Sequence, residues 1–305
     1  MRSFLAHRML RSTAPPRGGG FTLLDLIVTI VITGIAAGMV SMFIVKPIQG
    51  YVDLSRRAAL VDTAESSLRR MARDIRLALP NSVRVTNISG NGGFALELLP
   101  IVDGGKYTTK GATDTKINLQ GNFDQDFDIL GCLHAITPGS YTNYRLVINN
   151  LGTAGYDVYT TTGTTGVITP LGQTITVTDN VGAACPTTGD QHIHLSANHA
   201  FLDSSPHDRL FVVETPVTYL CDTASGTLTR YAGYPIQASQ PTTAAVLNGL
   251  SGVTSALVAD SISACDIATT SSDLRNRGLV TLNLSLSKDA ETIRLIHQVQ
   301  LDNSR

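Results

Sequence analysis

The stretch that decides the fold runs from Gly20 to Val45 and reads GFTLLDLIVTIVITGIAAGMVSMFIV. Its one ionisable side chain is that of Asp25. The 25 residues after Gly20 would form a helix of about 37 Å at ~1.5 Å per residue, while a hydrocarbon core is ~30 Å thick. The stretch therefore predicts a membrane-spanning helix over residues 21–46.

A short basic segment, residues 1–20, precedes the apolar stretch. It carries no acid and four arginines: Arg2, Arg8, Arg11 and Arg17. Its removal would lower the number of basic residues from 23 to 19 against 24 acidic ones, a net charge of −5. A basic head on an acidic chain indicates a targeting leader. The positive-inside rule then places the leader in the cytoplasm and the body across the membrane.

Two other kinds of targeting segment fit this stretch less well. A secretory signal peptide has an apolar core of about 7–15 residues, and this run is longer, has a carboxylate near its start and lacks an A-x-A site directly behind it. An uncleaved membrane anchor accounts for the apolar run but leaves Asp25 without a purpose. A carboxylate in a spanning helix costs roughly 2.5–3.5 kcal/mol and usually has a partner.

The helix is predicted to continue over residues 47–80 as an amphipathic segment that ends at Pro80. Pro47 removes one backbone donor and should kink or loosen the helix. Apolar residues then recur at steps of three or four and form one stripe: Leu60, Ala64, Leu68, Met71, Ile75 and Leu79. Glu65 and Arg69 form an i,i+4 pair, and the other arginines favour a solvated helix face over a phosphate site.

The stretch from Gly20 to Asp25 resembles the class III signal of type IV prepilins and pseudopilins. That signal has a glycine, an aromatic residue, Thr-Leu-aliphatic, and an acid at the fifth mature position. The basic leader, apolar helix, proline and amphipathic extension follow in the family's order. Further stretches are similar to minor-pilin-like biogenesis proteins of mannose-sensitive haemagglutinin (MSHA) type IV pili, which are related to J-type minor pilins and pseudopilins: Val45–Asp53, Arg56–Asp62, Leu68–Arg76, Leu79–Arg84, Leu146–Gly152 and Leu295–Val299.

The resemblance implies an α+β fold of the type IV pilin kind, with the long helix packed on an antiparallel β-sheet domain at residues 81–305. It implies that a prepilin peptidase/N-methyltransferase cuts after Gly20 and methylates the amine of Phe21. It also implies that Asp25 neutralises the amine of an adjacent subunit in the filament. The chain departs from the family's usual pattern in two places: Asp25 replaces a Glu, and three glycines follow Arg17.

Asp25 also has an explanation that needs no filament. An acid one turn into a helix faces the positive end of its own helix dipole and its own free amine. Pairing between subunits and capping within one chain therefore both remain open for Asp25.

Four cysteines lie downstream of the apolar stretch, and none forms a C-x-x-C pair: Cys132, Cys185, Cys221 and Cys265. An even number on the exported side predicts two disulfides, for which three pairings exist. We prefer Cys132–Cys185 with Cys221–Cys265, because neighbours in the sequence close smaller loops. Buried free thiols are the alternative.

The body reads as short strands and loops rich in Gly and Thr, and we expect one domain. The last hairpin has its turn at residues 288–291, with alternating apolar residues on both sides: Val280, Leu282, Leu284, Leu286, Ile293, Leu295, Val299 and Leu301. A second hairpin is predicted from Leu210 to Tyr231, with its turn near residues 222–226. Residues 150–190 fit either strands or a surface loop.

Two small sets of residues are candidates for metal ligands. Alternating acids hint at calcium: Asp124, Asp126 and Asp128. An EF-hand loop needs Gly and Glu where the chain has Ile129 and Ala135, so solvated loop acids are preferred. Three histidines could bind a metal, the first two on one strand face: His192, His194 and His199. Histidines unrelated to a metal are preferred, and no cofactor is expected.

The remaining patterns bear on the class of function. The net charge of −1 gives no indication of a nucleic-acid partner. The sequence has no G-x-S-x-G, P-loop or H-E-x-x-H motif, so we expect no enzyme.

With the resemblance, these patterns predict a minor pilin that helps initiate or cap assembly of an MSHA-type pilus. It would sit in a Gram-negative inner membrane with its C-terminal domain in the periplasm. Its partners would be other minor pilins and the major pilin. The alternatives are a J-type minor pseudopilin of a type II secretion system, a glycan-binding adhesin at a pilus tip, and a membrane-anchored periplasmic enzyme.

Overall fold

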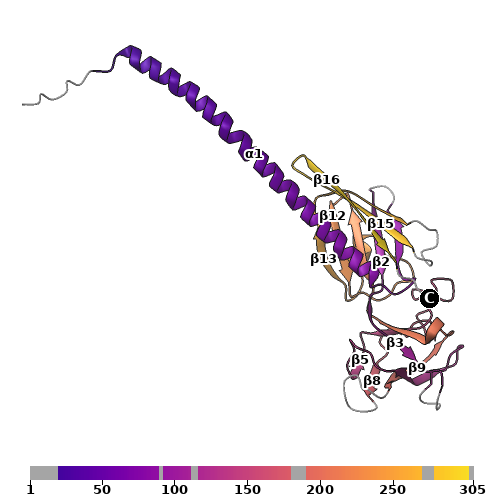
Figure 1. Ribbon diagram of the computed structural model, residues 1–305. Helices are drawn as coiled ribbons and strands as arrows, with labels where there is room; N and C mark the ends of the chain where they lie inside the picture. Colours follow the sequence, from indigo (N-terminus) through magenta and orange to yellow (C-terminus); the bar gives the residue numbers. More distant parts are fainter. Residues whose placement is uncertain (1–19, 89–91, 111–115, 180–189, 270–277, 302–305) are drawn as a thin grey trace, which may run out of the picture. The chain divides into compact units, whose positions relative to one another are not determined.

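The chain folds into one long helix and antiparallel β-sheets, an α+β architecture (Figure 1). It divides into two compact units, Met1–Ser55 and Arg56–Arg305. The boundary falls within helix α1, Leu23–Arg76. The computed structural model describes these residues: 20–88, 92–110, 116–179, 190–269 and 278–301.

In the first unit, the part of α1 up to Ser55 exposes its side chains, most of which are apolar. Its most apolar window has a mean hydropathy of 2.3 and is not buried within the chain. By length and composition, α1 could therefore cross a membrane. Pro47 lies inside the helix and does not interrupt it, because a proline removes only one backbone donor.

In the second unit, the predicted apolar stripe of α1 is confirmed as its buried face. The buried residues of α1 are Leu60, Ala64, Ser67, Leu68, Met71, Ala72 and Ile75. The helix ends at Arg76, four residues before the predicted stop at Pro80. It ends there because the following backbone forms hydrogen bonds with a neighbouring segment: Leu79 N–H donates to Leu99 and Ile101 N–H donates to Leu77.

The buried face of α1 packs into the largest core together with two sheets. The first sheet has five strands in the order β1-β2-β11-β12-β13. Their bounds are Arg84–Asn87, Gly93–Leu98, Val217–Asp222, Thr227–Ala232 and Thr254–Ala259. All pairs in this sheet are antiparallel, and Figure 1 shows β2, β12 and β13 near the second half of α1.

The second sheet on this core has three antiparallel strands in the order β14-β15-β16. Their bounds are Ile262–Thr269, Leu279–Lys288 and Glu291–Gln300. The predicted last hairpin is confirmed, because β15 and β16 pair from Lys288 opposite Glu291 onward. Asp289 and Ala290 form its two-residue turn with positive φ angles of 50° and 68°.

The third sheet has a core of its own, built around Phe127, Ile129, Ile193 and Leu195. Its strands follow the order β5-β8-β9-β4-β3-β10-β6, with β7 paired to β9 in parallel. The bounds from β3 to β6 are Ile101–Tyr107, Asp124–Leu130, Gly139–Tyr141 and Arg145–Val147. The bounds from β7 to β10 are Thr165–Gly166, Ile175–Asp179, Gln191–Phe201 and Arg209–Val213.

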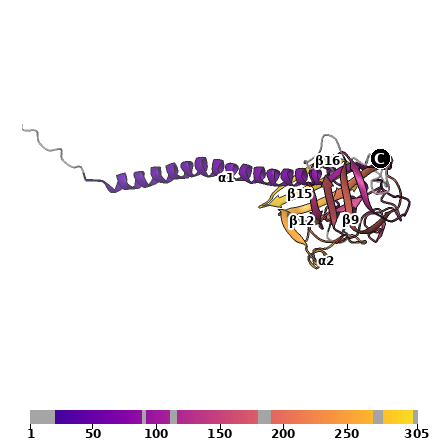
Figure 2. The same cartoon turned by 90° about the horizontal axis from the view of Figure 1, so that it is seen from below.

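The body also has two short helical elements, the 3-10 turn η1 at Pro206–Asp208 and helix α2 at Ala244–Asn248. Figure 2 shows α2. The second predicted hairpin is only partly correct. Its turn joins β11 and β12 as expected, but the residues from Leu210 onward form β10 in the third sheet. Short apolar strands look alike in sequence, so the pattern did not reveal the change of sheet.

Candidate functional site

The candidate site is the segment at the start of α1, where the sequence predicts the cut. Gly20 and Phe21 precede the helix, and both are exposed, with Phe21 89% exposed. Apart from Gly20 itself and its chain neighbours, no atom of the described residues lies within 4 Å of the position that a Cβ at Gly20 would occupy. The peptide bond between these two residues is therefore uncovered within the described part of the first unit. The rest of the expected leader, residues 1–19, lies outside the described residues.

Thr22 and Asp25 form a capping box at the first turn of α1. The backbone N–H of Asp25 donates to Oγ1 of Thr22 at 3.2 Å. In return, the N–H and the hydroxyl of Thr22 donate to Oδ2 of Asp25 at 3.2 and 2.8 Å. The reciprocal bonds satisfy backbone donors that a helix start would otherwise leave unpaired. The carbonyl of Thr22 accepts from Leu26 N–H, as expected of an N-cap residue.

The capping box assigns a definite intrachain role to Asp25. Both hydrogen bonds that its carboxylate accepts use Oδ2, and within the described residues no hydrogen bond reaches Oδ1. A carboxylate can accept at both oxygens, so capping leaves one oxygen for a donor from elsewhere. The two roles left open by the sequence are therefore compatible. The T-x-x-D pattern could have identified Thr22 as the cap from the sequence, but it was missed.

Two threonines of the apolar half are satisfied inside the helix. The Thr29 hydroxyl donates to the carbonyl of Leu26 at 2.9 Å, and the Thr33 hydroxyl donates to the carbonyl of Thr29 at 2.6 Å. An unsatisfied hydroxyl would be costly in a bilayer, where water is absent. These bonds suit the helix to an apolar surrounding.

The cysteines stabilise the body rather than the helix. Cys221 on β11 and Cys265 on β14 form a disulfide, one of the two pairs preferred from the sequence. It joins the five-stranded and three-stranded sheets across 44 positions of sequence. Cys132 is also disulfide-bonded, and Cys185 lies outside the described residues.

The three alternating acids lie on β4, so the interpretation as loop acids is wrong. The carboxylate of Asp124 accepts from the backbone N–H groups of Asn118 at 2.7 Å and Gln125 at 3.0 Å. Asp126 and Asp128 instead contact histidines of β9. Where the structure describes the chain, no three His, Cys, Asp or Glu side chains are arranged to hold a metal ion.

The three histidines on β9 have different surroundings. His192 and His194 lie on one face of the strand, as the sequence predicted, and both contact Asp126. His199 is fully buried, and its Nε2 lies 3.3 Å from the carbonyl of Gly166. Burial lowers the pKa of His199 to about 4, with a smaller effect of Arg145 in the same direction. His199 is therefore a neutral core residue.

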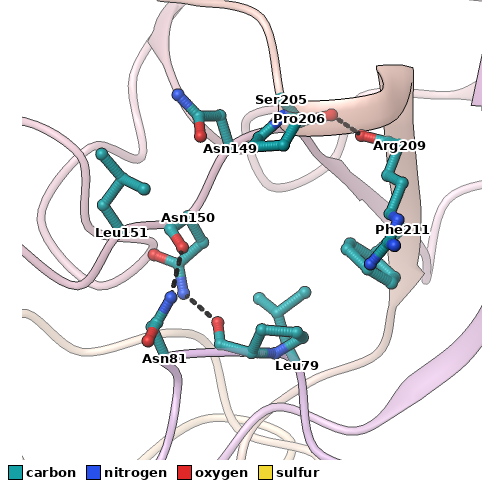
Figure 3. Close-up of a pocket in the computed structure, with 10 residues that line it drawn as sticks. Leu79, Asn81, Asn149, Asn150, Leu151, Ser205, Pro206, Arg209 and Phe211 are labelled. Atoms are coloured by element: carbon teal, nitrogen blue, oxygen red, sulfur yellow. Dashed lines mark hydrogen bonds between the residues drawn. The ribbon is translucent and has the colours of Figure 1, made fainter. Parts of the chain in front are cut away.

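A pocket lies between residues 79–81, which follow α1, the loop at residues 149–151, and residues at and beside η1 (Figure 3). Its polar groups hold the pocket's own backbone together. The Asn81 amide donates to the carbonyl of Asn150 at 2.9 Å, and the Asn150 amide donates to the carbonyl of Pro80 at 2.8 Å. These amides stabilise the loops around the pocket, and no ligand chemistry follows from them.

The fold and the site define a class of protein in which, over the described residues, one helix is able to span a membrane and a disulfide-bearing β-rich body follows it. No family model, curated protein or solved structure matches the chain. The more particular assignment therefore depends on the segment from Gly20 to Asp25 and on the chemistry that it permits.

Proposed function

We propose that the chain is a minor pilin that is cut after Gly20 by a prepilin peptidase and helps initiate or cap an MSHA-type type IV pilus. The observation that carries the proposal is the start of α1. An exposed Gly20–Phe21 bond is followed at once by a capped helix, and Asp25 is the one acid in the apolar part of that helix up to Val45. The sequence resemblance to class III signals supports the same reading.

The proposed mechanism follows from the position of the cut. Cleavage would free the amine of Phe21, four residues before Asp25 and one before the cap residue Thr22. In an apolar surrounding, an unpaired ammonium and an unpaired carboxylate are both costly, so pairing them selects one register between packed helices. Oδ1 of Asp25 would accept from the amine of a neighbouring subunit while Oδ2 keeps the helix capped. The peptidase would methylate the same amine.

The body would present the surface that neighbouring minor pilins recognise. The buried stripe of α1 and the Cys221–Cys265 disulfide fix the helix and two sheets in one core. Such a body could remain folded after transfer from the inner membrane into a filament. We propose a periplasmic location for it, because disulfides persist in oxidising compartments.

Co-purification tests the proposal against a J-type pseudopilin, which would share this helix start. The full chain is coexpressed with a prepilin peptidase and one of two sets of minor subunits. One culture supplies the subunits of an MSHA-type pilus, and a second culture supplies those of a type II secretion system. The proposal predicts recovery with the pilus set. Recovery with the secretion set alone would favour the pseudopilin. Binding to a glycan array without pilus subunits would favour an adhesin.

A further inference from the structure

His192 lies between two carboxylates of the neighbouring strand. Its Nδ1 is 2.8 Å from Oδ1 of Asp128, and its Nε2 is 3.2 Å from Oδ1 of Asp126. A neutral imidazole has one N–H group and one lone pair, so it could donate to only one of these oxygens. The second contact would then set two lone pairs against each other. Both contacts are favourable only when the ring carries two N–H groups, as an imidazolium.

The strand register explains why these side chains meet. Asp128 pairs directly with His192, and Asp126 pairs directly with His194. His194 Nδ1 lies 2.7 Å from the same Asp126 oxygen that contacts His192. Between Asp126 and Asp124 the register of the two strands shifts, so that Asp124 pairs with His199. The cluster therefore lies at the last regular pairs before an irregularity between β4 and β9.

We propose that His192, Asp126 and Asp128 form a proton-dependent clamp between β4 and β9, closed when His192 is protonated and loosened when it is neutral. A charged clamp places one positive group between two negative ones in a partly buried position. Loss of the proton removes one donor and leaves the two carboxylates to repel each other. An unpaired charge would be most costly at Asp128, because only 8% of its side chain is exposed to water.

The pKa values agree with this geometry. Burial lowers the pKa of His192, but the hydrogen bonds that Asp128 and Asp126 accept from the imidazole outweigh burial and raise it overall. Burial raises the pKa of Asp126, while the contacts to His194 and His192 lower it overall. The folded pKa of His192 thus lies above its unfolded value, so its contribution to stability is complete below the unfolded pKa. It is lost as the pH rises through the folded pKa.

The other strands around the cluster bring little competing charge. On β8, Thr178 and Thr176 pair with His192 and His194. The charged Asp179 pairs with Gln191 at the end of that strand. On β3, Lys106 pairs with Leu130. Of the charged neighbours within β4, Asp124 accepts backbone N–H groups instead of contacting the imidazoles. Asp190, just before β9, accepts from the backbone of Gly131.

Two measurements on the full chain in detergent micelles test the clamp. NMR of histidine-labelled protein follows the protonation of His192 directly, and hydrogen exchange at β4 and β9 follows the opening of the strands. Each exchange rate is divided by the intrinsic rate at the same pH. We expect a His192 midpoint above 6.5. Protection should fall by at most about tenfold per pH unit as the pH rises from about 6.5 to that midpoint, and level off above it.

Variants separate the clamp from general alkaline loosening. His192→Gln should have low protection at β4 and β9 at every pH, without the wild-type step. His134→Gln, at an exposed histidine outside these strands, should keep the step. A His192 midpoint at or below 6.5 in the wild type would overturn the proposal even if His192→Gln did not fold. A step that persists in folded His192→Gln, or one that EDTA shifts, would overturn it as well.

Discussion

The hydroxyl of Tyr219 on β11 donates a 2.7 Å hydrogen bond to Oδ2 of Asp74 on α1, joining residues 145 positions apart. Arg230 on β12 donates to the same oxygen at 3.2 Å. These two bonds are polar contacts at the edge of the apolar core that α1 shares with the five-stranded sheet. Burial, followed by the contact with Asp74, raises the pKa of Tyr219, so the hydroxyl remains a donor over the ordinary pH range.

Removing the Tyr219 hydroxyl should weaken the docking of α1 on the sheet. We expect Tyr219→Phe to lower the free energy of unfolding by about 1–3 kcal/mol, because a charged acceptor loses a donor. Urea unfolding in micelles, followed by near-ultraviolet circular dichroism of the tyrosines, measures the change. Tyr231→Phe on β12 is the matched control, since that hydroxyl makes no hydrogen bond within the described residues, and it should cost less. Equal losses in the two variants would contradict the assignment.

The last hairpin offers a direct comparison between core and surface. Leu284 on β15 is fully buried, whereas Ile296 on β16 is 61% exposed. Ile296 pairs with Asn283, the residue before Leu284. Leu284→Ala should cost about 2–5 kcal/mol, because it removes buried contacts and leaves a cavity. Ile296→Ala should cost about 0.5 kcal/mol or less. If Ile296→Ala lowered the free energy of unfolding more than Leu284→Ala did, the same experiment would contradict the assignment of Leu284 to the buried face of β15.

His199 should make the protein sensitive to acid. Its folded pKa of about 4 lies below its unfolded value, so it contributes stability that is present above about pH 6.5. That contribution is lost as the pH falls toward 4, with a slope of at most about 1.4 kcal/mol per pH unit. His199→Leu should flatten this part of the curve, whereas His134→Gln should not. An unchanged slope in the folded Leu variant would show that other groups cause the acid sensitivity.

The two roles of Asp25 can be separated by two substitutions. Thr22→Val removes the hydroxyl of the capping box but keeps the carboxylate, and should cost about 0.5–2 kcal/mol of helix-start stability. Amide exchange at the first turn of α1 measures this loss. Asp25→Asn keeps an oxygen that can cap but removes the charge. Under our proposal it therefore abolishes co-purification with pilus subunits.

Retained co-purification of Asp25→Asn would limit Asp25 to its own helix. Loss of co-purification in Thr22→Val alone would instead make the helix cap the feature on which assembly depends.

The sequence was most informative where periodicity is long and regular. The α1 stripe and the β15–β16 hairpin each repeat over many residues, so their buried faces could be predicted. The separate third sheet could not be predicted, because most of its strands are short and their partners lie far away in the sequence. Residue 191 on β9, for example, pairs with residues 129 and 179. Nothing local in the sequence specifies such partners.

Buried polar pairs were the other feature that could not be predicted from the sequence. Glu97 on β2 is fully buried, and it accepts from Arg84 on β1 and, at 2.9 Å, from the hydroxyl of Tyr234. Arg84 and Glu97 face each other in the register of β1 and β2. The sequence gives no sign of this burial, because a charged residue in a strand usually indicates the solvent face. His192 between Asp126 and Asp128 was missed for the same reason.

The proposed function depends first on cleavage of the bond between Gly20 and Phe21. The mass of the mature N-terminal peptide measures that cleavage. The full chain is expressed with and without a prepilin peptidase, and its N-terminal peptide is read by mass spectrometry. We expect a chain that begins at Phe21, with or without a methyl group, only when the peptidase is present. A chain that still begins at Met1 with the peptidase, or one cut after residue 45, would contradict the proposed function.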